Sequence, residues 1–187
     1  MARLDSGEIG VIYDGREYVF RPSFRALDNL HQCVSVFDLW HSVQRNDVHA
    51  ARLVMDACYV GANHSELNDL IGHTEGVAGI CVERAGEIPD SELCVLAFAL
   101  LRNGLQGREG VKTTGEQSET HRAPEFNALD YVWAAVDKDR LGLSWDEAWN
   151  LTMHEFMAGM MVKFPDKIYD KAKQDAEVDA LMAKVGK

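Results

Sequence analysis

The chain has 187 residues, of which 47% are hydrophobic and 26% are charged, which is typical of a globular protein with one sizeable core and excludes a chain that is disordered throughout. Its formal net charge of −11 removes the phosphate attraction that drives non-specific nucleic-acid binding. No apolar run reaches the ~18 residues that a membrane span needs, so we expect a cytoplasmic protein that binds neither nucleic acid nor membrane.

The first predicted element is a β-hairpin. Two runs rich in β-forming residues, Ile9 to Tyr13 and Tyr18 to Phe20, flank Asp14-Gly15. Asp-Gly supplies the positive φ angles of a tight primed turn. Pro22 and Ser23 then suit the first turn and the cap of a helix.

Helices dominate the next part of the chain. From residue 34 to about 60 the apolar residues recur with a period of about 3.6, which predicts two helices that meet near residues 45–47. A short helix is expected from Ser65 to Leu70. The glycine-rich stretch 72–86 predicts one strand, Ile80 to Glu83, paired with the N-terminal hairpin. Pro89 opens a buried central helix, and Asn103-Gly104 is expected to end it.

Residues 107–124 combine glycine, threonine and charge without periodicity, which predicts a flexible loop or linker. It would separate an N-terminal domain, residues 1–106, from a C-terminal helical subdomain, residues 125–187. The second part is expected to hold three helices, the last of them charged and amphipathic. We therefore predict a mainly α (α+β) fold, with an N-terminal β-hairpin followed by a helical bundle.

Four cysteines, at positions 33, 58, 81 and 94, lie in apolar sequence and contain no C-x-x-C pair. This pattern favours four buried free thiols over a metal site or disulfides.

The stretch LGLSWDEAWNLTMHEFMAGMMVKFP, residues 141–165, contains the pair His154-Glu155 on an expected helix. A helical metalloprotease site needs a second histidine four positions after the first, and this position is Ala158. Ser144 and Glu147 instead fit a capping box, which gives Glu147 a structural role. We therefore predict no catalytic, metal-binding or cofactor-binding residues, and a protein that is not an enzyme.

Bulky side chains in the same stretch recur at steps of three or four residues, which predicts one packing stripe along one helix. Two interpretations remain open: the stripe packs on the protein's own helix around Trp133, or it forms a groove for a partner's helix. Methionine adapts to varied partners, which favours a wide apolar face. The predicted partner-binding residues are Trp145, Trp149, Met153, Met157, Met160, Met161 and Phe164.

Three segments together resemble the tail assembly chaperones of long-tailed bacteriophages. They are GEIGVIYDGREYVFRPSFRAL near the start, IPDSELCVLAFALLRNGLQG in the middle, and FNALDYVWAAVDKDRLGLSWDEAWNLTMHEFMAGMMVKFP toward the end. The resemblance implies a protein that binds the phage tape-measure protein and keeps it soluble while the tail tube assembles. It also implies that the protein works in the host cytoplasm and is absent from the mature virion.

In many of these phages a ribosomal frameshift makes a longer form that also binds the tail tube protein, so the resemblance implies that this chain is the short form. Two rival functions remain open from the residues alone. One is an acidic phage-encoded inhibitor that occupies a host nucleic-acid-binding site, and the other is a small metal-dependent enzyme. Self-association is also left open.

Overall fold

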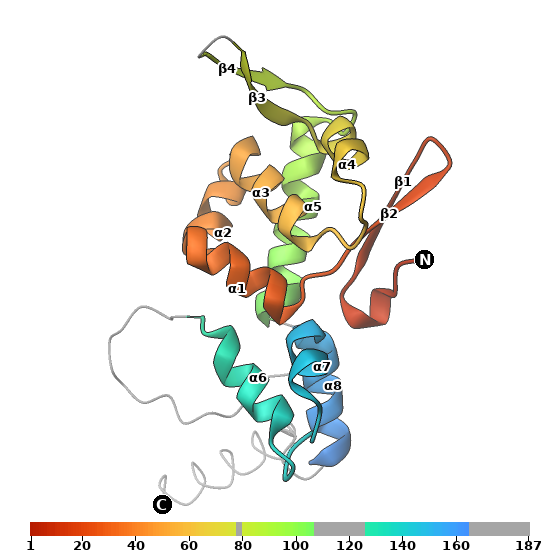
Figure 1. Ribbon diagram of the computed structural model, residues 1–187, viewed down its shortest axis with the longest axis vertical. Helices are drawn as coiled ribbons and strands as arrows, with labels where there is room; N and C mark the ends of the chain where they lie inside the picture. The colour runs from red at the N-terminus through yellow and green to blue at the C-terminus, as the bar shows by residue number, and fades with distance from the viewer. Residues whose placement is uncertain (78–79, 107–125, 165–187) are drawn as a thin grey trace, which may run out of the picture.

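The computed structural model describes residues 1–77, 80–106 and 126–164 (Figure 1). The predicted fold class is confirmed: the chain is mainly helical, with an N-terminal hairpin. In chain order the elements are the 3-10 helix η1 (Leu4–Ser6), the strands β1 (Ile9–Tyr13) and β2 (Arg16–Phe20), the helices α1 (Phe24–Cys33), α2 (Val36–Gln44), α3 (Val48–Cys58) and α4 (His64–Ile71), the strands β3 (His73–Val77) and β4 (Ile80–Arg84), and the helices α5 (Asp90–Gln106), α6 (Ala128–Val136), α7 (Trp145–Asn150) and α8 (Met153–Lys163). The loop predicted at 107–124 and the last predicted helix lie outside the described residues.

The N-terminal hairpin forms as the Asp-Gly turn predicts. β1 and β2 are antiparallel, with Tyr13 opposite Arg16. Asp14 (φ 47°) and Gly15 (φ 72°) both take left-handed conformations, which a primed two-residue turn requires. Phe20 at the end of β2 is fully buried, so the hairpin is anchored on the helical core by its last residue.

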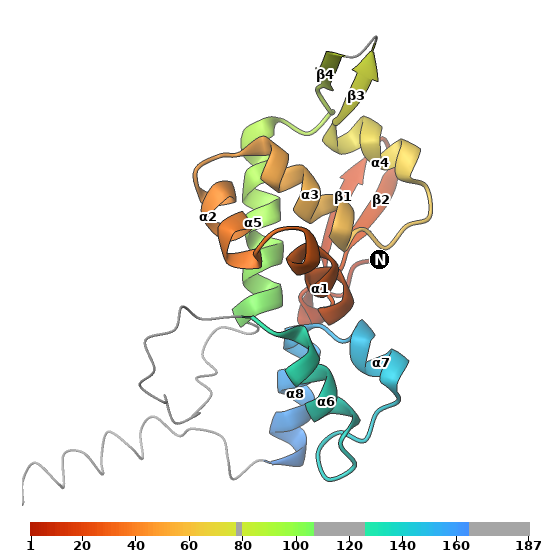
Figure 2. The ribbon, with the colours of Figure 1, turned by 60° about the vertical axis from the view of Figure 1, so that its left-hand side comes forward.

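Side-chain caps fix the starts of the first helices. The Ser23 hydroxyl accepts a hydrogen bond from the Ala26 amide at the start of α1, as predicted, and the Asp47 carboxylate accepts one from the Ala50 amide at the start of α3. The helices predicted to meet at residues 45–47 are α2 and α3. Both pack along α5, which runs through the centre of this part of the molecule (Figure 2).

The expectation that α5 ends at Asn103-Gly104 is wrong, because the helix continues to Gln106. Gly104 has another role. A Cβ atom at this position would lie 2.9 Å from Cδ1 of Leu27 and 3.1 Å from Cβ of Pro22. The glycine therefore allows the end of α5 to lie against the start of α1.

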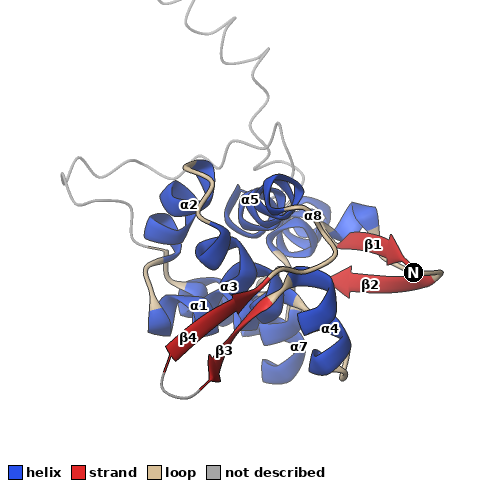
Figure 3. Cartoon of the chain, turned by 90° about the horizontal axis from the view of Figure 1, so that it is seen from above, coloured by secondary structure: helices blue, strands red, loops and turns tan. Residues whose placement is uncertain are grey.

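The strand predicted from Ile80 is present as β4, but its predicted pairing is wrong. β4 pairs with β3 in a separate two-stranded sheet, and neither strand joins the N-terminal hairpin (Figure 3). Glu75 on β3 and Arg84 on β4 form a cross-strand ion pair of 2.6 Å. This second hairpin projects beyond α4 at one end of the molecule (Figure 1).

The stretch after Ser144 forms two helices and not the single expected one. The capping box of Ser144 and Glu147 opens α7 as predicted, and a second capping box, made by Thr152 and Glu155, opens α8. The chain bends between them at Leu151, whose carbonyl accepts a hydrogen bond of 2.9 Å from the Phe24 amide. The predicted continuous stripe is therefore divided between two helices.

Helices α6, α7 and α8 pack against the N-terminal part through a shared core. The Phe24 ring on α1 lies 5.4 Å from the Tyr131 ring on α6 and 5.9 Å from the Phe156 ring on α8, between ring centroids. The two predicted parts thus meet across one aromatic cluster, while the loop predicted to separate them lies outside the described residues. None of the described helices is long and apolar enough to cross a membrane.

The prediction of four buried thiols is correct for two of them. Cys58 and Cys94 are buried, and burial raises the pKa of the Cys58 thiol to about 12. Cys33 at the end of α1 and Cys81 on β4 are exposed. The apolar neighbours that suggested burial belong to an amphipathic helix end and to a projecting hairpin, where adjacent residues point to different sides.

Candidate functional site

Two exposed tryptophans meet where α6 lies against α7. The centroids of the Trp133 and Trp145 rings are 4.9 Å apart in an edge-to-face arrangement, and Trp149 continues the group at 6.2 Å from Trp145. Trp133 is 59% exposed and Trp145 is 43% exposed. With Leu129, one turn before Trp133 on α6 and 38% exposed, these residues form what we call the tryptophan surface.

This arrangement bears on both interpretations of Trp145. The side chain packs against the protein's own Trp133, as the first interpretation predicted. The contact leaves both rings open to solvent on one side. Exposed large aromatics that touch each other are uncommon on a surface without a partner, and such groups are typical anchors of protein interfaces.

Local structure holds the two helices at this angle. Asn127 caps α6 by accepting a hydrogen bond from the Leu129 amide, and the Ser144 capping box starts α7. Between them Gly142 takes a left-handed conformation (φ 68°), and the Leu143 amide returns to the Ala135 carbonyl at 3.0 Å. The tryptophans are therefore placed by a short, hydrogen-bonded connection.

The other predicted partner-binding residues lie elsewhere. Met153 (4% exposed) and Met157 (7% exposed) point into the protein's own core, so they are not offered to a partner. Met160 and Met161 on α8 are half-buried, and so is Phe164 at the C-cap of this helix. Only Trp145 and Trp149 of the predicted set belong to the tryptophan surface.

The surface also includes two residues that the sequence analysis did not predict to bind a partner. Leu129 and Trp133 are four residues apart on α6 and so share one helix face. Their spacing in the sequence indicates a helix, but not which of its faces is exposed. Exposure of that face depends on which side of α6 faces α1, which no local pattern shows.

Acidic side chains border the tryptophan surface. Asp130, Asp137, Asp146 and Glu147 are all exposed and lie next to its residues on α6 and α7; we call them the acidic rim. Arg25 pairs with Asp146 at 2.7 Å. The hydroxyl and amide of Ser144 donate to Glu147 and lower the pKa of its carboxyl group. Glu147 therefore stays negatively charged at neutral pH.

The contacts of His154 and Glu155 hold neighbouring parts of the fold together. The Glu155 carboxylate accepts hydrogen bonds from the Thr152 amide at 3.1 Å and from the guanidinium of Arg21. His154 lies against Gly7, where a Cβ atom would be 3.2 Å from its Cγ. Among the described residues, no group of three or more His, Cys, Asp or Glu side chains is arranged to hold a metal ion.

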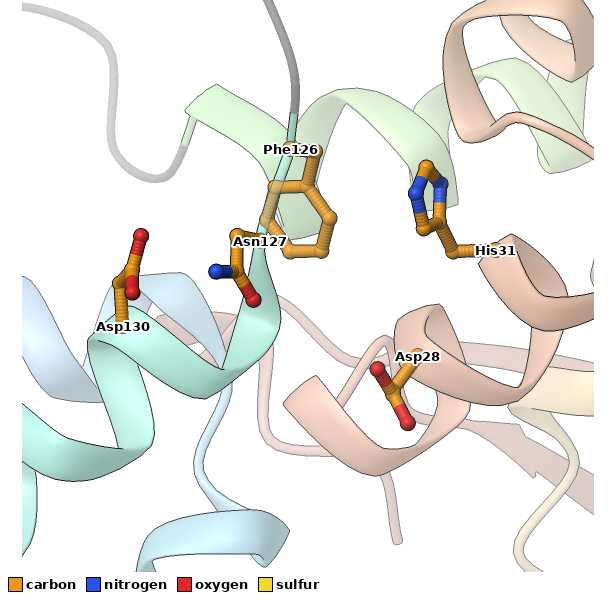
Figure 4. A pocket seen from close by; sticks show the side chains of 5 residues that line it. All are labelled: Asp28, His31, Phe126, Asn127 and Asp130. Carbon is orange, nitrogen blue, oxygen red and sulfur yellow. The ribbon is translucent and has the colours of Figure 1, made fainter.

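A pocket of about 370 Å³ lies between α1 and the start of α6. Figure 4 shows Asp28 and His31 projecting from α1, opposite Phe126, Asn127 and Asp130. The Nδ1 atom of His31 is buried and has no hydrogen-bond partner among the described residues. Asp130 belongs to both the pocket and the acidic rim, so the pocket adjoins the tryptophan surface. No sequence pattern points to this pocket, since about a hundred residues separate its two walls.

Comparison with known proteins adds one match. Residues 25–180 match a protein family of unknown function, DUF6246. No curated protein and no solved structure matches the chain. The matched range contains α6 and α7 in full, and therefore the whole tryptophan surface.

Proposed function

The chain belongs to the DUF6246 family, whose function is unknown, and we propose that it is a phage tail assembly chaperone that binds the tape-measure protein through the tryptophan surface. One observation carries the proposal. Trp133 and Trp145, from different helices, contact each other and leave a continuous aromatic face in solvent. The choice of client comes from the resemblance of three segments to tail assembly chaperones.

The tryptophan surface suits a helical client. An amphipathic helix presents its apolar residues at i, i+3, i+4 and i+7, and such a stripe fits a surface made by two helices that meet at an angle. Tryptophan supplies a large contact area with few rotatable bonds, so little side-chain entropy is lost on binding. The tape-measure protein is a long helical protein with many such stripes.

The acidic charge of the chain favours the same role. A net charge of −11 makes coated complexes repel one another, which opposes aggregation of the client. The affinity at each stripe need not be high, because a long client offers many sites and avidity multiplies them. The protein would act in the host cytoplasm before the tail is complete, and a longer frameshifted form would bring in the tail tube protein.

Co-expression with the tape-measure protein of the same phage tests the proposal. The wild-type protein should co-purify with this client and keep it in the soluble fraction. In a Trp133→Ala/Trp145→Ala variant, capture should fall by roughly tenfold or more, because aromatic anchors dominate binding energy. The fold should survive, at a cost of about 1–3 kcal/mol for the lost ring contacts.

A matched control is Leu53→Ala, since Leu53 is 50% exposed on α3, away from the tryptophan surface. This variant should capture the client as the wild type does. A client that is soluble alone and never co-purifies would overturn the proposal. So would equal capture by the double tryptophan variant.

A further inference from the structure

We propose that the pocket between α1 and α6 binds a positively charged side chain, lysine or arginine, from the helical segment that covers the tryptophan surface. This inference rests on the proposed function and adds which kind of client side chain the pocket binds. The pocket residues are those shown in Figure 4.

The charge of the pocket favours a cation. Asp28 from α1 and Asp130 from α6 line it, and no lysine or arginine is among its lining residues. The positive end of the α6 dipole lies beside it, but this amounts to about half an elementary charge against two full negative ones. The carboxylates would repel an anionic ligand, and a neutral donor would gain less from them than a cation, which adds attraction between opposite charges to its hydrogen bonds.

Phe126 adds an apolar wall to the two carboxylates, and His31 and Asn127 complete the lining. Phe126 is 6% exposed and its ring stacks on Tyr131 at 5.9 Å between centroids, so its remaining edge forms an apolar wall against which the stem of a long side chain can pack. The volume of about 370 Å³ is in the range of pockets that hold small ligands. A metal ion is a poorer fit, because the described acidic and imidazole groups do not converge as a ligand set.

The position of the pocket ties it to the client. Asp130 follows Leu129 directly and lies one turn before Trp133, so its Cβ is about 5–6 Å from that of Trp133. A helix that lays its apolar stripe on the tryptophan surface therefore has side chains about one turn away that face the pocket. Lysine and arginine have the length to reach in while their stems stay in apolar contact.

The pocket is tested first with small probes on the intact protein. Butylguanidinium, with uncharged butanol as its neutral counterpart, is titrated into 15N-labelled protein and followed by NMR. Butylguanidinium should shift the amide resonances of His31, Asn127 and Asp130. In Asp28→Asn/Asp130→Asn its affinity should fall by about tenfold or more, because charge-assisted hydrogen bonds are lost.

The matched control is Asp139→Asn, which removes one charge from an exposed position after α6 and outside the pocket. It should bind butylguanidinium like the wild type. If butanol shifts the same resonances as strongly, or if Asp28→Asn/Asp130→Asn binds butylguanidinium unchanged, the pocket does not recognise a cation and the inference is overturned.

Client capture separates this inference from the proposed function. Asp28→Asn/Asp130→Asn should capture the tape-measure protein several-fold less well than Asp139→Asn does. If the tryptophan variant loses the client while the pocket variant keeps it in full, the proposed function stands and the cation pocket is wrong. If butylguanidinium binds but neither the wild type nor any variant captures the client, the proposed function fails.

Discussion

At the scale of single residues, Thr152 joins the two ends of the described chain. It is fully buried, caps α8 by accepting from the Glu155 amide, and donates its own hydroxyl hydrogen to the Ser6 carbonyl at 2.6 Å. Replacing it with alanine removes the cap and leaves a buried carbonyl without a donor. We expect Thr152→Ala to lower the free energy of unfolding by about 2–4 kcal/mol, measured by urea denaturation.

Thr152→Ser is the control, since it keeps the hydroxyl group and should cost less than half as much. If Thr152→Ala lowers the free energy of unfolding by less than about 0.5 kcal/mol, neither hydrogen bond of the Thr152 hydroxyl contributes to stability.

Residue-level signals also explain which caps were predictable. Ser144-x-x-Glu147 was identified as a capping box, and the same pattern recurs as Thr152-x-x-Glu155. The second was missed because Trp149, Thr152 and Phe156 keep a helical spacing across the bend. No glycine or proline lies at the break between α7 and α8, so only the repeated capping pattern marks the break in the sequence.

At the scale of elements, Gly104 sets the distance between α5 and α1. Intrinsic helix propensity favours alanine over glycine by about 1 kcal/mol in a helix interior. Here a methyl group would press on Leu27, which is fully buried, and on the rigid ring of Pro22. We expect Gly104→Ala to destabilise the protein by about 1–3 kcal/mol in spite of propensity, measured by thermal or urea unfolding.

Gly159→Ala on α8 is the comparison, because its nearest neighbour would be the half-buried Leu141 side chain at 3.1 Å, which is freer to move. It should change stability less than Gly104→Ala. Stabilisation by Gly104→Ala would mean that α5 and α1 can separate without cost.

Element prediction succeeded where the cause was local. The Asp14-Gly15 turn fixes the first hairpin, and the caps at Ser23 and Ser144 lie within four residues of the groups that they satisfy. The partner of β4 was wrong because β3, with the sequence HTEGV, has one glycine and few β-forming residues. Its strand conformation comes from pairing with β4, which periodicity does not reveal.

The candidate site was less predictable than the elements for the same reason. Trp145 and Trp149 were identified, but the side of α6 that faces solvent, and hence Trp133, is set by packing on α1. The pocket joins Asp28 to Asp130, and nothing near either residue points to the other. Burial of Met153 and Met157 follows from the bend before α8, which turns these residues inward.

At the scale of the whole molecule, an ion-pair network links the N-terminal segment, the first hairpin and α8. The Arg21 guanidinium lies between the carboxylates of Glu8 and Glu155 and also donates to the Asn150 carbonyl. Glu8 is 7% exposed, so replacing it should lower the stability of the entire fold. Burial alone would raise the pKa of Glu8, but the hydrogen bond from the Arg3 amide and the paired Arg21 outweigh it and lower the pKa below its ordinary value of 4.5.

This lowered pKa predicts how the stability of the whole molecule depends on pH. Because the folded protein favours the charged form of Glu8, the pair contributes fully above the unfolded pKa, and its contribution is lost as pH falls through the folded pKa. At pH 7, Glu8→Gln should lower the free energy of unfolding by about 1.5–3 kcal/mol, and this difference from the wild type should shrink below about pH 4. Urea titrations at several pH values measure both curves, with the exposed Glu92→Gln as a control that should change stability by under about 0.5 kcal/mol. A difference of the same size at pH 3.5 as at pH 7 would show that the shape of the Glu8 side chain, and not its charge, holds the N-terminal segment to α8.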